Sequence, residues 1–308
     1  MKYISTKEAE KKWNISERRI RKLLEDNRIE GAFKLGKTWN IPDNVSKPID
    51  KRNTKDNSYY TFNINQELLN QIESLNKELN KRRPLSKEAL KTIKDSFNLE
   101  MIYNSNGIEG NTLTLRETQI VLEGITIGGK TVKEHLEIIN HEQALIFLDE
   151  LVKDNNPISE WNIKNIHQLI LKNIDNDNAG KYRNENVLIM GAKHNPPDYI
   201  KVPEQMERLI ANYNKWNYHP LIKAALFHGE LVKIHPFIDG NGRTARLIMN
   251  LILINNGYLP VIIKKEDRLN YYNALDKAHT TNDYTDFINI IIELELEILN
   301  KYLEFLVL

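Results

Sequence analysis

The chain has 308 residues, a formal net charge of +1 and no cysteine. This length allows two or three domains with a buried core, and a net charge near zero excludes strong overall attraction to nucleic acid or to membranes. Without cysteine there is no disulfide and no thiolate zinc site. No apolar signal segment follows the N-terminal Met-Lys, and the apolar runs near residues 247–254 and 285–308 are too short or too interrupted by Glu to span a bilayer. We therefore expect a cytoplasmic protein without a membrane partner.

The first 48 residues differ from the rest in charge, because they carry +5 and the remaining residues carry −4. Residues 5–13 and 16–26 predict two short helices. Ser5 begins a capping box with Glu8, and Ser16 is a suitable N-cap for the second helix. Residues 32–41 then alternate around a Gly-Lys turn, which predicts a small β-wing.

This region contains, in order, the short patterns STKEA, W-x-IS, R-x-I-x-x-L, GA-x-K-x-G and W-x-IP. Together they resemble winged helix-turn-helix domains of the excisionase/MerR type. The resemblance implies a module of residues 1–48 that binds double-stranded DNA through basic residues of its second helix. These residues are Arg18, Arg19, Arg21 and Lys22. The alternative is a small protein-docking or dimerisation domain with a solvated basic face.

Residues 49–60 are polar and poor in apolar side chains, which indicates a linker. The rest of the chain shows helical periodicity and no internal repeat, so a mainly α fold is expected. Helices are expected around residues 68–79 and 90–97, and over 114–124, 131–153, 159–174, 203–216, 219–234, 243–256, 266–279 and 283–305.

Two segments interrupt the helical pattern. Residues 105–111, SNGIEGN, read alone as a turn because of their glycines. Residues 180–199 join the apolar run at 187–189 to a Gly/Pro-rich turn, which predicts a strand and a β-hairpin. This is the one convincing β pattern after residue 60, and it could be an ordinary surface hairpin or an exposed edge that binds an extended partner.

Residues 235–246, HPFIDGNGRTAR, combine a titratable imidazole, a carboxylate, two glycines and two arginines just before an apolar helix. Gly240 and Gly242 allow backbone N–H groups to curl around an anion at the helix N-terminus. Asp239 offers an oxygen ligand for Mg²⁺, and Arg243 and Arg246 lie three residues apart on one helix face, where both can bind phosphate. The loop therefore predicts a site for a phosphorylated ligand.

This string matches the signature HxFx(D/E)GNGRxxR of the Fic family at every defined position, and the resemblance covers roughly residues 62 to 298. It implies a Fic-type helical core with a small β-hairpin flap, and transfer of AMP from ATP to a Ser, Thr or Tyr hydroxyl of a target protein. His235 would be the general base, and Asp239 would hold Mg²⁺ or Mn²⁺. The implied phosphate ligands are Gly240, Asn241, Gly242, Arg243 and Arg246.

The resemblance extends to other segments. Residues 105–111 resemble the Fic inhibitory motif (S/T)xxxE(G/N), with Ser105 as its first residue, so Glu109 would pair with Arg246 and inhibit the enzyme in cis. A kinase relative, the Doc toxin, has Lys at the position of Gly242, so this glycine favours AMP transfer. Tyr272 would lie near the nucleoside, whereas His279 stands where relatives have an asparagine. The target-binding residues of the flap would be Val187, Leu188 and Ile189.

The implied organisation is a helical region with the inhibitory helix over residues 61–140, followed by the catalytic core over 141–308. Two other functions stay open, a nucleotide-sensing transcriptional regulator with weak transfer activity and a hydrolase that removes AMP from proteins. A homo-oligomer also stays open. The histidines at 135, 141, 219 and 228 lack a metal-binding spacing and are expected to be packing or surface residues.

Overall fold

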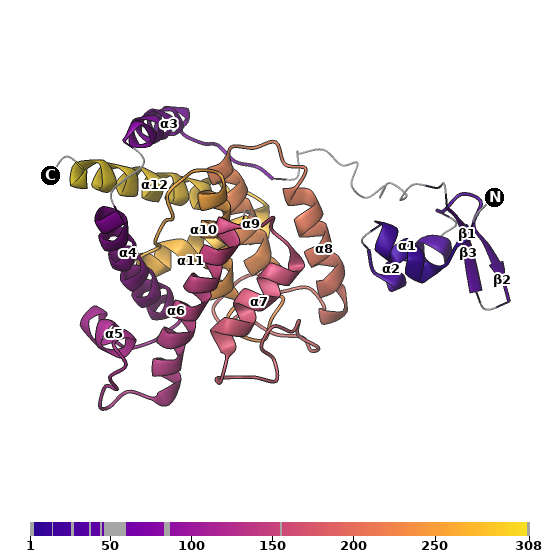
Figure 1. Ribbon diagram of the computed structural model, residues 1–308, viewed down its shortest axis with the longest axis horizontal. Helices are drawn as coiled ribbons and strands as arrows, with labels where there is room; N and C mark the ends of the chain where they lie inside the picture. The colour runs from indigo at the N-terminus through magenta and orange to yellow at the C-terminus, as the bar shows by residue number, and fades with distance from the viewer. Residues whose placement is uncertain are drawn as a thin grey trace. The chain divides into compact units, whose positions relative to one another are not determined.

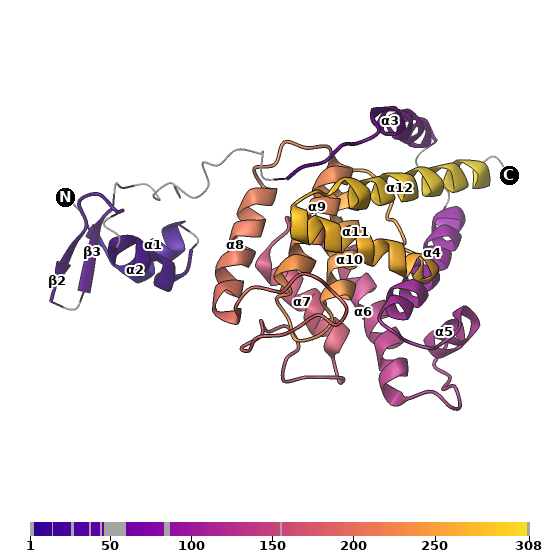
Figure 2. The same ribbon diagram turned by 180° about the vertical axis from the view of Figure 1, so that it is seen from behind.

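The computed structural model describes residues 3–13, 15–25, 28–36, 38–43, 45, 60–82, 87–154 and 156–306. The chain forms two compact units, Met1–Tyr59 and Tyr60–Leu308 (Figures 1 and 2). Most of the expected linker, residues 49–59, lies outside the described residues. Among the residues that are described, no helix has both the length and the apolar character needed to cross a membrane.

The first unit contains two helices and a small antiparallel sheet. Its elements are β1 (Tyr3–Ile4), α1 (Thr6–Trp13), α2 (Glu17–Glu25), β2 (Phe33–Leu35) and β3 (Thr38–Pro42), with strand order β1-β3-β2. The Ser5 capping box is present, since the Ser5 N–H donates to Glu8 at 2.7 Å and the Glu8 N–H donates to the Ser5 hydroxyl at 3.3 Å. Buried side chains of both helices, among them Trp13, Ile20 and Leu24, form its core.

The second unit is helical. Its elements are α3 (Gln66–Lys81), α4 (Lys87–Ile108), α5 (Leu115–Leu122), α6 (Val132–Lys153), α7 (Glu160–Leu171), η3 (Tyr199–Lys201), α8 (Val202–Tyr213), α9 (Pro220–Ile234), α10 (Asn241–Asn255), η4 (Lys265–Asp267), α11 (Arg268–Thr281) and α12 (Thr285–Phe305). Capping side chains define the starts of several helices, and Thr114 and Thr131 form complete capping boxes at α5 and α6. The predicted helices from residue 114 onward are confirmed to within a few residues at each end.

Helices α9 and α10 are the centre of this unit. In Figure 1 the pair α6 and α7 lies in front of one side of these two helices, and the pair α11 and α12 lies on their other side. Helix α10 packs against α4, α6, α7 and α9. Twelve of the fifteen residues of α10 are buried, from Asn241 to Leu253 with one exception, Gly242. An apolar helix surrounded on all sides by other helices holds its N-terminus in a fixed place.

Three expectations need correction. The predicted β-hairpin is wrong: residues 181–198 contain no strand, and the next element is the 3-10 helix η3. Pro196 and Pro197 lack N–H donors for a ladder, and side chains rather than a partner strand hold this segment. The reading of 105–111 as a turn, from these residues taken alone, does not hold for residues 105–108, which form the last turn of α4. The division expected after residue 140 falls inside the continuous helix α6.

Candidate active site

His235 directly follows α9 and has a left-handed backbone with φ 50°, which is unusual for a residue other than glycine. Its N–H donates to the Leu231 carbonyl at 3.0 Å, and its Nδ1 lies 3.3 Å from the Val232 carbonyl. Burial lowers the pKa of His235 to about 4, so the ring is neutral near pH 7. If the proton lies on Nδ1, facing this carbonyl, the lone pair of Nε2 is available to accept a proton.

The Asn241 side chain holds the loop after His235 through two hydrogen bonds to the main chain of Phe237. The side-chain oxygen of Asn241 accepts the Phe237 N–H at 3.0 Å, and its amide nitrogen donates to the Phe237 carbonyl at 2.9 Å. Phe237 itself is fully buried, as expected for an apolar residue that anchors the loop. The Asn241 side chain thus has a structural task, which leaves its main chain for ligand binding.

His167 in α7, which is fully buried, also holds this loop. Its Nδ1 accepts the Gly180 N–H at 2.9 Å, so Nε2 carries the proton and donates to the Asp239 carbonyl at 2.9 Å. The ring stacks on Phe237 at a centroid distance of 3.6 Å. Gly240 has φ 74°, and a Cβ there would approach the His167 ring at 3.3 Å. Sequence reasoning missed His167, because no motif singles it out.

The N-terminus of α10 is suited to bind an anion. Its N-cap, Gly240, makes no side-chain capping bond, so the first N–H groups of the helix have no acceptor one turn earlier. The Glu109 carboxylate lies against this turn, because a Cβ added to Gly242 would stand 2.4 Å from Glu109 Oε1. A carboxylate at a helix N-terminus occupies the place that the helix dipole offers to phosphate.

Arg246 binds the end of α4, as the resemblance implied. Its Nη2 lies 2.7 Å from Glu109 Oε1 and donates to the Ser105 carbonyl at 2.8 Å, and its Nε donates to the Ser105 hydroxyl at 2.9 Å. The Arg246 side chain is almost completely buried. Burial alone would lower the pKa of Arg246, but the Glu109 charge outweighs it and raises that pKa, so the guanidinium stays charged.

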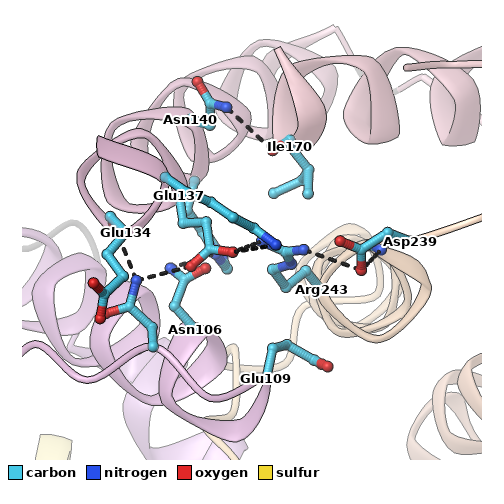
Figure 3. A network of polar contacts seen from close by, with 12 residues as sticks. Asn106, Glu109, Glu134, Glu137, Asn140, Ile170, Asp239 and Arg243 are labelled. Carbon is cyan, nitrogen blue, oxygen red and sulfur yellow. Dashed lines mark hydrogen bonds and ion pairs between the residues drawn. The ribbon is translucent and has the colours of Figure 1, made fainter. Parts of the chain in front are cut away.

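Arg243 is the second buried guanidinium, and it lies between two carboxylates (Figure 3). Its Nη1 lies 3.3 Å from Glu137 Oε1 and its Nη2 lies 3.4 Å from Asp239 Oδ1. Glu137, in α6, also accepts a hydrogen bond of 2.9 Å from the Asn111 side chain. Sequence reasoning missed Glu137, which stands in an unremarkable helical stretch far from both arginines in sequence.

Asp239 is a residue of this loop whose carboxylate could hold a cation. Burial raises its pKa, but Arg243 and the Gly240 N–H offset this and lower the pKa below its usual range, so the carboxylate is charged. The described contacts of Asp239 engage only Oδ1, with the Gly240 N–H at 2.6 Å and Arg243 at 3.4 Å. Oδ2 can therefore serve as one ligand of Mg²⁺, whose usual protein ligands are one or two carboxylates completed by phosphates and water.

Tyr272 and His279, the two residues expected near the nucleoside, differ in their exposure to solvent. Tyr272 is 37% exposed, and its hydroxyl donates to the Ile108 carbonyl at 3.4 Å, beside the end of α4. His279 is buried and bonds the Gly229 carbonyl through Nε2 at 2.9 Å. Burial, followed by the nearby His194 ring, lowers the pKa of His279 to about 3. His279 thus packs against α9, and Tyr272 has the more accessible side chain.

The expected target-binding residues lie on the strandless segment 184–198. Leu188 is 82% exposed, whereas Val187 and Ile189 are half-buried. The segment is tied to α11 by the Lys193 N–H, which lies 3.3 Å and 3.4 Å from the two carboxylate oxygens of Asp276. It therefore has exposed apolar side chains on a backbone with fixed attachment points.

Comparisons with known proteins agree with this geometry. Residues 157–253 match the model of the Fic/DOC family. A Fic domain containing signaling protein from Bacteroides thetaiotaomicron is 32% identical in sequence, with a TM-score of 0.69 over 77% of this chain and 96% of that one. The chain belongs to the Fic family. Fic-1 (aa134 - 508) from C. elegans is also 32% identical, with a TM-score of 0.68 over 78% of this chain and 72% of that one.

Curated relatives carry the name protein adenylyltransferase Fic. That of Drosophila melanogaster is 36% identical over 222 residues, which are 71% of this chain and 44% of the relative. That of Nematostella vectensis is 35% identical over 249 residues, or 78% of this chain and 56% of the relative. The chain thus spans about half the length of the curated relatives that it matches.

Proposed function

We propose that this Fic protein is an adenylyltransferase that moves AMP from ATP to a hydroxyl side chain of a target protein. The observation that carries the proposal is the position of His235. A neutral imidazole adjoins the uncapped N-terminus of α10, where buried Arg243 and Arg246 and the carboxylate of Asp239 also meet. The curated relatives named protein adenylyltransferase Fic support the same activity.

In the proposed reaction, the target hydroxyl oxygen attacks the α-phosphorus of ATP. A new oxygen–phosphorus bond forms, the bond between the α-phosphorus and the bridging oxygen to the β-phosphorus breaks, and pyrophosphate leaves. His235 Nε2 takes the hydroxyl proton. The first N–H groups of α10 and the two arginines bind the phosphates. Asp239 would hold Mg²⁺, which offsets the phosphate charge when it is bound.

We further propose that Glu109 inhibits this reaction in cis. The 2.7 Å ion pair occupies a guanidinium that would otherwise bind the γ-phosphate, and the carboxylate stands over the phosphate-binding helix terminus. One Nη2 group cannot serve a carboxylate and a phosphate equally well. The inhibited protein would bind ATP in a position that is unsuited to attack.

The experiment uses ATP labelled at the α-phosphate, Mg²⁺ and a cell lysate, with the parent chain, Glu109→Gly and Glu109→Gly/His235→Ala. Label in proteins with Glu109→Gly, and none with the double variant, supports the proposal. Label that persists in the double variant would refute the role of His235. If proteins labelled by Glu109→Gly lose AMP when the parent chain is added, the parent acts as a hydrolase.

A second function, binding of double-stranded DNA, is proposed for the first unit on the basis of its charge. Arg18, Arg21 and Lys22 are exposed on α2 and Arg19 is half-buried, in a segment that carries +5. Full-length protein should bind duplex DNA with an affinity that falls steeply as salt rises. Unchanged binding in Arg18→Ala/Lys22→Ala would contradict this assignment and favour a protein-docking role.

A further inference from the structure

Arg183 is a buried guanidinium that the proposed mechanism does not use. It lies in the connection between α7 and α8 and is 3% exposed. Its Nε donates to the His235 carbonyl at 2.8 Å, its Nη1 donates to the Glu185 carbonyl at 2.9 Å, and its Nη2 donates to the Pro197 carbonyl. All three acceptors are main-chain oxygens, so this side chain fixes the backbone of other segments.

One of these segments is the main chain around His235. A residue other than glycine keeps a left-handed backbone only where its surroundings hold it there. The carbonyl of His235 accepts from the Arg183 guanidinium, and the carbonyl of Pro236 accepts from the Arg183 N–H at 2.9 Å. Arg183 therefore holds two consecutive carbonyls at the residue whose imidazole takes the proton.

The other segment is the candidate target-binding stretch, residues 184–198. Glu185 lies at its beginning and Pro197 at its end, and one guanidinium holds both. A further bond joins the same stretch to the end of α9, where His194 Nε2 lies 3.0 Å from the Lys233 carbonyl. In the absence of a strand ladder, these side-chain bonds define the shape of the segment.

We propose that Arg183 is a positioning residue for AMP transfer. Its side chain holds the His235 imidazole and the 184–198 segment in a fixed position relative to each other. The inference rests on the proposed function. Arg183 does not belong to the phosphate-binding residues, which come from α10 and the loop before it. Its loss should slow the chemical step and leave ATP binding unchanged.

Lysine is the informative replacement. It keeps the positive charge, but a single ammonium group at the end of a flexible chain cannot reproduce a planar fork that reaches three carbonyls in different directions. A shift of about 1 Å in a reacting group can reduce a rate by roughly 100-fold. We therefore expect Arg183→Lys to lower the maximal rate of transfer by about that factor, with the KM for ATP changed by less than about twofold.

The test compares Glu109→Gly with Glu109→Gly/Arg183→Lys in self-labelling from α-phosphate-labelled ATP and Mg²⁺. The matched control is Glu109→Gly/Lys181→Met, because Lys181 is exposed two residues away and its side chain bonds only the Asp177 carbonyl in the described contacts. An unchanged maximal rate in the Lys variant would overturn the proposal. A raised KM for ATP at full maximal rate would also overturn it.

Amide hydrogen exchange of the same proteins gives a readout that does not depend on activity. Arg183→Lys should speed exchange in residues 184–198 and in residues 235–240 together, with α10 to α12 unchanged. Faster exchange throughout the second unit would instead mean that Arg183 only stabilises the fold, and would overturn the positioning role. If Glu109→Gly transfers no AMP, the proposed function fails, and exchange alone decides whether Arg183 joins the two segments.

Discussion

The two buried arginines of α10 have similar surroundings but different partners. Arg243 pairs with Glu137, in the second turn of the 22-residue helix α6, whereas Arg246 pairs with Glu109, directly after the end of α4. Gly110, the next residue, has φ 100° and ends the helical path. We therefore expect Glu109, which follows a helix end, to leave its arginine at a lower free-energy cost than Glu137, whose backbone is fixed inside a helix.

The largest expected effect concerns the base of the reaction that both arginines are proposed to serve. In the Glu109→Gly background, His235→Ala should lower AMP transfer by about 10²- to 10⁴-fold, the usual contribution of a positioned base. Calorimetric titration should show that ATP still binds, since the arginines are intact. Retention of more than roughly a tenth of the rate would mean that another group takes the proton.

The second effect separates the two carboxylates. Glu109→Gly should raise the rate of self-labelling about 10- to 150-fold over the parent chain, because a buried charge-assisted contact no longer competes with phosphate. Glu137→Gln is the matched control and should not activate, since Arg243 loses a partner that orients it. Equal activation by both variants would show that helix position does not distinguish the two carboxylates.

A smaller effect should come from Asn111, two residues after Glu109. Its side chain bonds Glu137 at 2.9 Å and the Glu134 carbonyl at 3.1 Å, so it holds the end of the 105–111 segment against α6. Asn111→Ala should raise self-labelling by roughly 2- to 12-fold, the value of one hydrogen bond, with Glu109 still present. Activity equal to that of the parent would mean that the Arg246 pair alone positions Glu109.

The smallest change is expected on lowering the pH. Burial lowers the pKa of His235 to about 4, so the base stays unprotonated as the pH falls and is lost only near that value. A histidine with an ordinary pKa would be about nine-tenths protonated at pH 5.5. The rate of Glu109→Gly should therefore differ by less than about twofold between pH 7.5 and 5.5, with folding checked by circular dichroism. A tenfold fall in folded protein would contradict the shifted pKa.

Sequence patterns predicted the helices because capping residues and apolar periodicity are local signals. The pair formed by Glu109 and Arg246 was also predicted, although 137 positions separate the two residues, since the motif resemblance joined them. The hairpin at 184–198 was wrong, because an apolar β-branched run does not reveal whether a partner strand exists. Here the backbone bonds go to Arg183 and Asp276 instead.

The supporting residues could not be predicted for a different reason. His167, Glu137 and Arg183 come from separate parts of the chain, and His167 and Arg183 act on main-chain carbonyls, which every residue has. No spacing rule identifies a side chain and the distant main-chain carbonyl that it binds before the fold is known. The motif residues were recognisable because their chemistry depends on side chains at fixed intervals.

The missing side chain at Gly242 limits how this protein could change its chemistry during evolution. Any Cβ at that position would stand 2.4 Å from Glu109 Oε1, so a residue with a side chain there would displace the carboxylate from Arg246. A substitution that introduced a side chain at this position would therefore also remove the inhibition that we propose for Glu109. If the proposed inhibition operates, a descendant whose phosphate-binding turn changed in this way would begin unregulated and would need a separate inhibitor.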